Sequence, residues 1–369
     1  HQFQPLFYQV STCGLESSSI VFPFRRMFHG KKNINFRLTK VDMVHPTENY
    51  VSTPLGKVEY DHLVIATGAG NNYFGNKNIE EKAFPMKSLS QSLRLRNVIL
   101  ERFEQALSVP YEQQSDFLTF VIAGGGPTGT ELAGSLAEMR NEILPKDFPE
   151  LDFSKMKIIV VDGGQRVLAA MSPKSSEQAH HYLKELGCEI RLATLVKDYD
   201  GDTVYLGDDT TIRSKTLIWS AGIKGNMVDG FDPEVVVPGN RLKVDTFNRV
   251  VGQDNVYAIG DIACMLTEDL PRGHPQMAQP AIQQGRNLAK NFKAMKNGKA
   301  LTPFKYRNLG AMATVGRNKA VVELPNKQFG GFFAWFTWMF VHLKSILGVK
   351  NKFLIFINWV WNYFTYNSS

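Results

Sequence analysis

Cysteine is scarce in this chain, which has only Cys13, Cys188 and Cys264 among its 369 residues. No two of them are spaced as Cys-x-x-Cys or Cys-x4-Cys, so neither a cysteine metal site nor a redox-active pair is indicated. No other cluster of metal ligands and no Ser-His-Asp grouping stands out, so we expect no metal. Three scattered thiols are typical of buried side chains in a protein from a reducing compartment.

Long apolar runs are also missing. The two apolar runs of the C-terminal segment, 332–343 and 353–361, are far shorter than the ~20 residues that cross a bilayer. Acidic residues are nearly absent there, since residues 301–369 hold eight Lys/Arg and a single Glu. The same segment holds four of the five tryptophans, interleaved with lysines that include Lys344. Aromatic rings among lysines favour helices that lie in the headgroup region of a membrane. A buried helical hairpin or a dimer interface is the alternative, whereas nucleic acid is not expected, because the lysines are too sparse.

The length allows two or three domains. The chain begins with His1 rather than Met and shows no signal peptide, so we expect a fragment or a processed product. Short apolar runs alternate with amphipathic stretches, which predicts an α/β fold with a doubly wound parallel sheet. We expect strands at 63–66, 117–123, 157–161, 188–193, 216–220 and 256–259, and helices at 88–108, 173–186 and 280–296.

The most informative motif is the run Gly124-Gly125-Gly126-Pro127-Thr128-Gly129, between an apolar strand and a helix-like stretch. A Gly-x-Gly-x-x-Gly in that context binds a dinucleotide. Its first glycine permits the tight turn, its second lets the backbone approach the pyrophosphate, and its third lets the helix pack against the strand.

Two acidic residues accompany this loop. Asp162 follows the next strand, where a carboxylate accepts hydrogen bonds from the ribose of NAD, although it lies 33 residues beyond Gly129 and its alternative role is to cap a turn. Arg166 leaves open whether NADP is used instead. Glu131 lies in the first helical turn, where it either stabilises the helix or lies near the nicotinamide.

Two further loops follow predicted strands, Ala66-Thr67-Gly68 and Gly260-Asp261. Each alone is more often a plain turn, but together they suggest a second nucleotide. Gln279 and Gln283 are four residues apart on a predicted helix, so they share one face and could donate to a planar polar ligand. Solvent-facing glutamines are the alternative.

The chain closely resembles the type II NADH dehydrogenases, single-subunit NADH:quinone oxidoreductases that do not pump protons. The resemblance runs over nearly the whole length through PLFYQVSTCGLE, LVIATGA, GGGPTGTELAG, IWSAGI, VYAIGDIA, AQPAIQQG, YRNLGAMATVGRNKA and the aromatic tail. The glycine loop and Ala-Thr-Gly occur throughout the two-dinucleotide-binding flavoproteins. The aromatic tail together with AQPAIQQG is more specific to this family.

The resemblance implies two Rossmann-like domains, the NAD domain inserted in the FAD domain, and C-terminal amphipathic membrane-binding helices. The corresponding ranges are 1–85 for the first part of the FAD domain, 86–218 for NADH, 219–300 for the second part, and 301–369 for the membrane region. It assigns these residues to NADH: Gly124, Gly126, Pro127, Thr128, Gly129, Glu131, Asp162, Ala221 and Gly222. It assigns to FAD Ala66, Thr67, Gly68, Gly260, Asp261, Ala278 and Gln279, and to the quinone Gln279, Gln283 and Lys344. Glu131, Gln279 and Gln283 are the expected catalytic residues.

The activity that the resemblance implies is hydride transfer from NADH to FAD and electron transfer to ubiquinone or menaquinone in a respiratory chain. We expect a homodimer on a lipid surface, at the cytoplasmic face of a bacterial inner membrane or at the mitochondrial inner membrane. The family opens with its own Gly-x-Gly-x-x-Gly for FAD, which this chain lacks, so we expect the native protein to be longer. A chain with these residues alone is expected to bind FAD poorly. The alternatives are therefore a catalytically incomplete, membrane-associated nucleotide-binding fragment, or a ferredoxin or disulfide type of FAD reductase.

Overall fold

The computed structural model describes residues 1–365, and their packing divides the chain into two compact units. Unit 1 comprises residues 1–31, 73–222 and 310–365, and unit 2 comprises residues 32–72 and 223–309. The domain ranges expected from the sequence, with their FAD and NADH assignments, stay predictions.

Unit 1 is built on a parallel five-stranded sheet in the order β6-β13-β7-β8-β9. The strands are β6 (Phe84–Pro85), β13 (Thr216–Trp219), β7 (Thr119–Ala123), β8 (Lys157–Val161) and β9 (Glu189–Arg191). Every residue of β7 is buried, as expected of a parallel strand covered on both faces. This sheet confirms the predicted α/β class.

Helices of unit 1 follow the predicted pattern. The longest, α4 (Leu89–Leu107), starts at a capping box of Ser88 and Gln91 and buries Leu95, Ile99 and Phe103, at spacings of four that face the core. The helix α8 (Pro173–Glu185) starts at the Ser172 cap and is followed by Gly187 in the left-handed region, at φ +78°. The other helices are α1 (Phe7–Ser11), α2 (Phe24–Met27), α3 (Lys77–Lys82), α5 (Gln114–Leu118), α6 (Pro127–Glu138) and α7 (Leu144–Asp147).

Two predicted strands are shorter than expected by two or more residues, and those predicted at 63–66, 216–220 and 256–259 each end one residue earlier. The strand predicted at 117–123 starts at Thr119, because the two preceding residues complete α5 and the Thr119 hydroxyl donates to the Ser115 carbonyl over 2.7 Å. The strand predicted at 188–193 spans Glu189–Arg191, because the Cys188 N–H still bonds to the Leu183 carbonyl at the end of α8.

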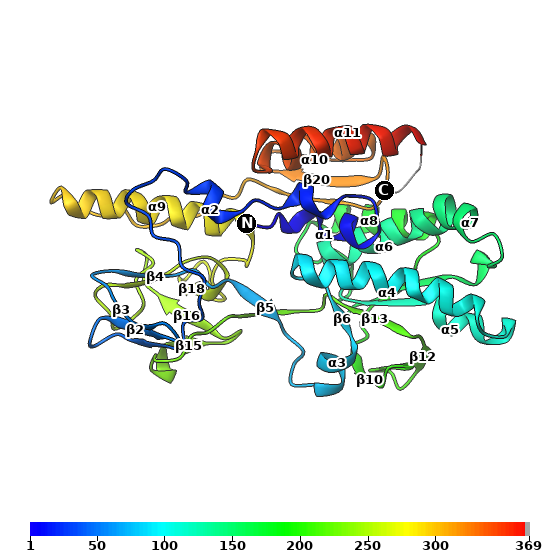
Figure 1. The fold of residues 1–369 in the computed structure, drawn as a ribbon, viewed down its shortest axis with the longest axis horizontal. Coiled ribbons are helices and arrows are strands. Elements are labelled where there is room, and N and C mark those ends of the chain that lie inside the picture. Colours follow the sequence, from blue (N-terminus) through cyan, green and yellow to red (C-terminus); the bar gives the residue numbers. More distant parts are fainter. Residues whose placement is uncertain (366–369) are drawn as a thin grey trace. The chain divides into compact units, whose positions relative to one another are not determined.

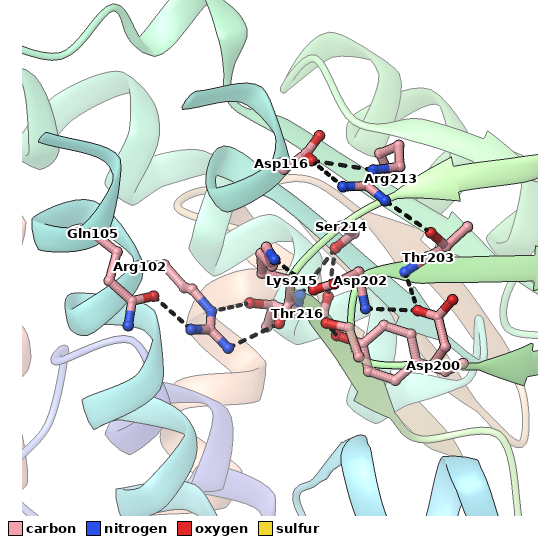
Figure 2. A network of polar contacts seen from close by, with 12 residues as sticks. Arg102, Gln105, Asp116, Asp200, Asp202, Thr203, Arg213, Ser214, Lys215 and Thr216 are labelled. Carbon is pink, nitrogen blue, oxygen red and sulfur yellow. Dashed lines mark hydrogen bonds and ion pairs between the residues drawn. The ribbon is translucent and has the colours of Figure 1, made fainter. Parts of the chain in front are cut away.

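Ion pairs and hydrogen bonds connect the elements at the amino ends of the strands of the five-stranded sheet (Figure 2). Arg102 of α4 donates to the Lys215 carbonyl over 2.9 Å and to the Thr216 hydroxyl over 3.2 Å. Arg213 pairs with Asp116 over 2.8 Å. Arg213 belongs to an antiparallel sheet of β10 (Val196–Tyr199), β11 (Thr203–Leu206) and β12 (Thr211–Arg213). These contacts hold the edge opposite to the glycine loop.

The C-terminal part of unit 1 is a three-stranded antiparallel sheet covered by two helices (Figure 1). The strands are β19 (Ala311–Thr314), β20 (Ala320–Leu324) and β21 (Lys327–Gly330), and the helices are α10 (Phe332–Ser345) and α11 (Val349–Thr365). Trp338 and Trp359 are buried, whereas the outer faces expose large apolar side chains such as Phe333 (75%) and Phe364 (77%). None of the helices in residues 1–365 has the length and hydropathy required to cross a membrane.

Within the described residues, unit 2 consists of two three-stranded sheets, β1-β2-β3 and β15-β16-β18, two strand pairs, β14-β5 and β17-β4, and one long helix, α9 (Ala278–Lys296). The parallel pair of β4 (Leu63–Ile65) with β17 (Val256–Ala258) confirms two predicted strands. The remaining strands are β1 (Met43–His45), β2 (Tyr50–Thr53), β3 (Gly56–Glu59), β5 (Ala69–Asn71), β14 (Ile223–Gly225), β15 (Val236–Val237), β16 (Arg241–Val244) and β18 (Ala263–Met265).

Candidate functional site

The glycine loop connects β7 to α6 at the carboxyl edge of the five-stranded sheet. Gly124 has φ +108°, and a Cβ there would lie 2.6 Å from the Ser220 carbonyl oxygen. A Cβ on Gly129 would overlap the Gly124 carbonyl oxygen, whereas a Cβ on Gly126 would meet no described atom within 4 Å. The first and third glycines are therefore required by the packing of the protein itself, and the second borders open space, as a backbone that approaches a pyrophosphate must.

The N-terminus of α6 is suited to an anion. Its N-cap is Gly126 and its first residue is Pro127, and no side chain of residues 1–365 caps it. The first N–H groups of a helix lack intrahelical partners and carry the positive end of the helix dipole, so a phosphate is stabilised there.

Asp162 lies beside this loop, because β7 and β8 are parallel neighbours. Its two carboxylate oxygens accept the N–H groups of Gly125 over 2.6 Å and Gly164 over 2.7 Å. Asp162 thus closes two turns. A contact with ribose, which requires the remaining lone pairs, stays a prediction. Ala221 and Gly222 follow β13, on the other side of β7, so the predicted NADH residues gather at one edge.

Glu131 lies on α6, two residues beyond the last loop glycine, and is 8% exposed. It lines a cavity of about 140 Å³ between α6, the N-terminal residues of unit 1 and the two C-terminal helices. The side chains around that cavity include Tyr8, Ser135, Glu138, Trp338 and Trp359. One helix therefore carries the glycine loop at its start and a buried carboxyl group in an aromatic cavity.

Burial raises the pKa of Glu131 to about 8. The Thr314 N–H, 3.5 Å from Oε1, and the nearby Trp338 indole favour the charged form and offset part of this effect. The indole N–H of Trp338 is itself buried without a hydrogen-bond partner within residues 1–365. A carboxyl group in these surroundings holds its proton at neutral pH.

Glu138 is seven residues further along α6, on the same helical face. Burial raises its pKa, while the N–H and the charge of Arg317 lower it. Arg317 donates to the carbonyls of Asn362 over 2.7 Å and Tyr363 over 3.1 Å. The cavity wall is in this way fixed to the end of α11.

In unit 2 the predicted loops lie at the carboxyl ends of β4 and β17, which are adjacent. Gly68 has φ +69°, and a Cβ there would meet no described atom within 4 Å. The Thr67 hydroxyl donates to the Asn226 carbonyl over 2.6 Å, and Gly260, at φ +73°, starts a helical turn that contains Asp261. The carboxyl ends of parallel strands are where nucleotides bind in α/β folds.

The comparisons with known proteins agree with this geometry. The family description "Pyridine nucleotide-disulphide oxidoreductase" matches residues 3–285, and "NDH2 C-terminal domain" matches residues 308–366. The type II NADH:quinone oxidoreductase Ndh of Mycobacterium tuberculosis is 35% identical over 97% of this chain and 80% of its own length. The chain belongs to the type II NADH:quinone oxidoreductases.

Other members of the family support the same placement. NdhA of Mycobacterium tuberculosis is 32% identical over 97% of this chain and 79% of its own length. The structure of NDH2 from Plasmodium falciparum in complex with NADH superposes with a TM-score of 0.90 at 20% identity, and the match covers 99% of this chain and 91% of that one. That similarity shows that the two proteins share a fold.

Members of this oxidoreductase family use FAD, and the residues of unit 2 fit such a group. The open space at Gly68 admits a ligand, and the turn that starts at Gly260 contains Asp261 at the carboxyl end of β17, where nucleotides bind in α/β folds. None of the three cysteines, all of which lie within residues 1–365, forms a disulfide, and burial raises the pKa of the Cys188 thiol to about 12, which is unlike the reactive thiol of a disulfide reductase.

The glutamines of α9 have different surroundings. Gln279 and Ala278 are exposed. Gln283 exchanges two hydrogen bonds of 3.0 Å with the backbone of Arg307, which leaves one N–H and one oxygen lone pair of its amide for a ligand. The buried glutamine is Gln284, whose Oε1 accepts the Gly260 N–H over 2.7 Å. Gln284 was not among the site residues predicted from the sequence, although it stands within the AQPAIQQG motif.

Lys344 is exposed on α10 and does not line the Glu131 cavity. Tyr8, Glu138 and Trp338 do line it, and the sequence analysis did not select them as site residues. Trp338 could have been selected from the sequence, because it belongs to the aromatic C-terminal segment. The two others could be found only from the packing of residues that are far apart in the sequence.

Proposed function

We propose that this chain oxidises NADH at the carboxyl edge of the five-stranded sheet and passes the electrons to a quinone at a membrane surface. The observation that carries the proposal is α6, which presents an open dinucleotide loop at Gly126 and, five residues later, the buried carboxyl group of Glu131. The first element is suited to NADH, and the second supplies a proton donor at neutral pH.

In this proposal, the backbone of Gly124, Gly126 and Gly129 and the N-terminus of α6 at Pro127 and Thr128 hold the pyrophosphate. Asp162 accepts from the ribose hydroxyls, and the turn at Ala221 and Gly222 lies against the nicotinamide half. These contacts fix the orientation of NADH, which contributes to the rate by pre-organisation.

FAD is held in the proposal by the ends of β4 and β17 and by the start of α9. The residues are Ala66, Thr67, Gly68, Gly260, Asp261, Ala278 and Gln279. When bound, FAD supplies the redox chemistry that links a two-electron hydride donor to a quinone.

Glu131 holds a proton on its carboxyl group, in a cavity whose lining includes the side chains of Trp338 and Trp359. Reduction of a quinone to a quinol consumes two protons, so a protonated acid near the reacting groups is a source of one of them. Gln279 and Gln283 orient the quinone head, and Lys344 provides a positive charge near the quinone entrance.

The exposed apolar faces of α10 and α11 lie on the lipid surface, which lets an apolar quinone enter without crossing water. The protein is then a peripheral membrane protein, on the cytoplasmic face of a bacterial inner membrane or on the mitochondrial inner membrane. A homodimer formed through the C-terminal region belongs to the same proposal.

The experiment is a quinone reductase assay with the FAD-loaded protein on lipid vesicles, which follows NADH by its absorbance. We expect NADH oxidation that depends on added quinone, with NADH used in preference to NADPH. A protein that binds NADH and FAD but leaves quinone unreduced would instead be a nucleotide-binding module without this activity.

A further inference from the structure

A second stretch without acidic residues lies near the start of the chain. Residues 17–41 contain no Asp or Glu, but they contain six cations: Arg25, Arg26, Lys31, Lys32, Arg37 and Lys40. The C-terminal residues 324–369 also lack Asp and Glu. The rest of the chain holds 32 Lys/Arg and 35 Asp/Glu, so these two positive-only segments account for the positive net charge.

The part of the first segment that belongs to unit 1, which ends at Lys31, meets the second segment there. The side-chain amide of Asn351, near the start of α11, donates to the Val21 carbonyl over 2.9 Å. Gly348, at φ +86°, packs so closely that a Cβ there would lie 3.0 Å from the Phe22 ring. The segment 21–31 is thus fixed beside the end of α11 at which Val349 (85% exposed) and Phe353 (63% exposed) begin its outward apolar face.

The segment itself has the make-up of a membrane-surface contact. Phe24 is 44% exposed and its ring is stacked on Phe28, with the ring centres 6.3 Å apart. Arg25, Arg26 and Lys31 of the same segment are exposed, and the Arg26 guanidinium lies 5.9 Å from the centre of the Phe22 ring. Exposed aromatic rings surrounded by cations are suited to the headgroup region of a bilayer, with the rings inside and the cations at the phosphates.

We propose that Phe24, Arg25, Arg26 and Lys31, hereafter the basic turn, form a second membrane contact that binds anionic lipid headgroups. The inference rests on the proposed membrane surface of α10 and α11 and adds to it a preference for negatively charged lipid. Continuity with the apolar face of α11 favours a bilayer over an acidic protein as the partner, because one lipid surface then covers the exposed rings of both segments and meets the cations at its headgroups.

The test is sedimentation of the full-length protein with vesicles of phosphatidylcholine alone and with vesicles that also contain phosphatidylglycerol. The variant replaces Arg25, Arg26 and Lys31 by Gln. Its matched control replaces three exposed lysines elsewhere in unit 1, Lys77, Lys146 and Lys174, by Gln, so that both proteins lose the same net charge. A variant with Arg25→Lys and Arg26→Lys retains the charge, and circular dichroism checks that all of them fold.

A cation near an anionic surface raises affinity roughly fivefold, so we expect the triple variant to bind anionic vesicles roughly 100-fold more weakly, with little change on neutral ones. The control and the lysine variant should bind as the unaltered protein does, and added salt should reduce the difference. Two results would refute the binding of anionic lipid by the basic turn: equal binding of the unaltered protein to both vesicle types, or equal losses of binding in the triple variant and the control. Neither result would contradict the proposed membrane surface of α10 and α11. Absence of binding to either vesicle would refute both.

Discussion

The buried carboxyl group of Glu131 should make the stability of the protein fall as the pH rises. Its pKa is about 8 in the folded protein and close to 4.5 in the unfolded chain, so the folded state binds the extra proton between these values. Stability from this group is complete below about pH 4.5 and is lost as the pH rises through 8. Each pH unit in that range costs about 1.4 kcal/mol, which sums to roughly 4 kcal/mol between pH 5 and 8.

The substitution Glu131→Gln keeps the size and polarity of the side chain and removes the titration. The variant should resemble the unaltered protein near pH 5 and become the more stable of the two by roughly 4 kcal/mol near pH 8. Urea unfolding at a series of pH values measures the difference, and the raised pKa of Glu138 cancels because both proteins contain it. The control is Glu177→Gln on the exposed surface of α8. Parallel pH curves for Glu131→Gln and the unaltered protein would refute the reasoning.

Three further predictions concern the loop, the cavity and the sheet edge. Gly126→Val should leave the stability unchanged, because a Cβ there meets only open space, and should raise the KM for NADH at least tenfold, because that space is where the pyrophosphate is proposed to bind. Gly129→Ala should instead destabilise the protein by about 1–3 kcal/mol, because its Cβ clashes with the Gly124 carbonyl. Urea unfolding and steady-state kinetics separate the two, and equal KM values would contradict the loop assignment. Trp338→Phe should raise the pH at which the stability change due to Glu131 is half complete, because the indole that is lost favours the charged carboxylate. Urea unfolding at a series of pH values measures this midpoint, and a downward shift would contradict the role of the indole. Arg102→Met should cost about 1–3 kcal/mol of stability, because it leaves the Lys215 carbonyl unpaired, without changing the KM for NADH; a changed KM would mean that the two edges of the sheet are coupled.

Local patterns in the sequence predicted much of the fold. The strand at 157–161 and the helix at 88–108 are confirmed to within a residue or so, because an apolar run and a helical periodicity are properties of neighbouring residues. The glycine loop could be recognised because its spacing is a pattern of neighbouring residues, although the atom that excludes a side chain at Gly124 belongs to Ser220, far away in the sequence.

The cavity could not be predicted in this way. Its walls come from residues as distant in the sequence as Tyr8, Glu131 and Trp338, and only the packing of the folded unit brings them together. The glutamines of α9 illustrate the same limit. Helical spacing placed Gln279 and Gln283 on one face, but it could not tell that the buried partner of the Gly260 turn is Gln284, because the burial of a face is decided by what packs against it.

The most direct test of the account is the stoichiometry of NADH oxidised to quinol formed by the FAD-loaded protein on vesicles, without oxygen, in the unaltered protein and in Gly126→Val. We expect one quinol for each NADH in the unaltered protein, whereas the variant should need far more NADH for the same rate. NADH oxidation that yields no quinol, or a variant that is as active as the unaltered protein at low NADH, would contradict it.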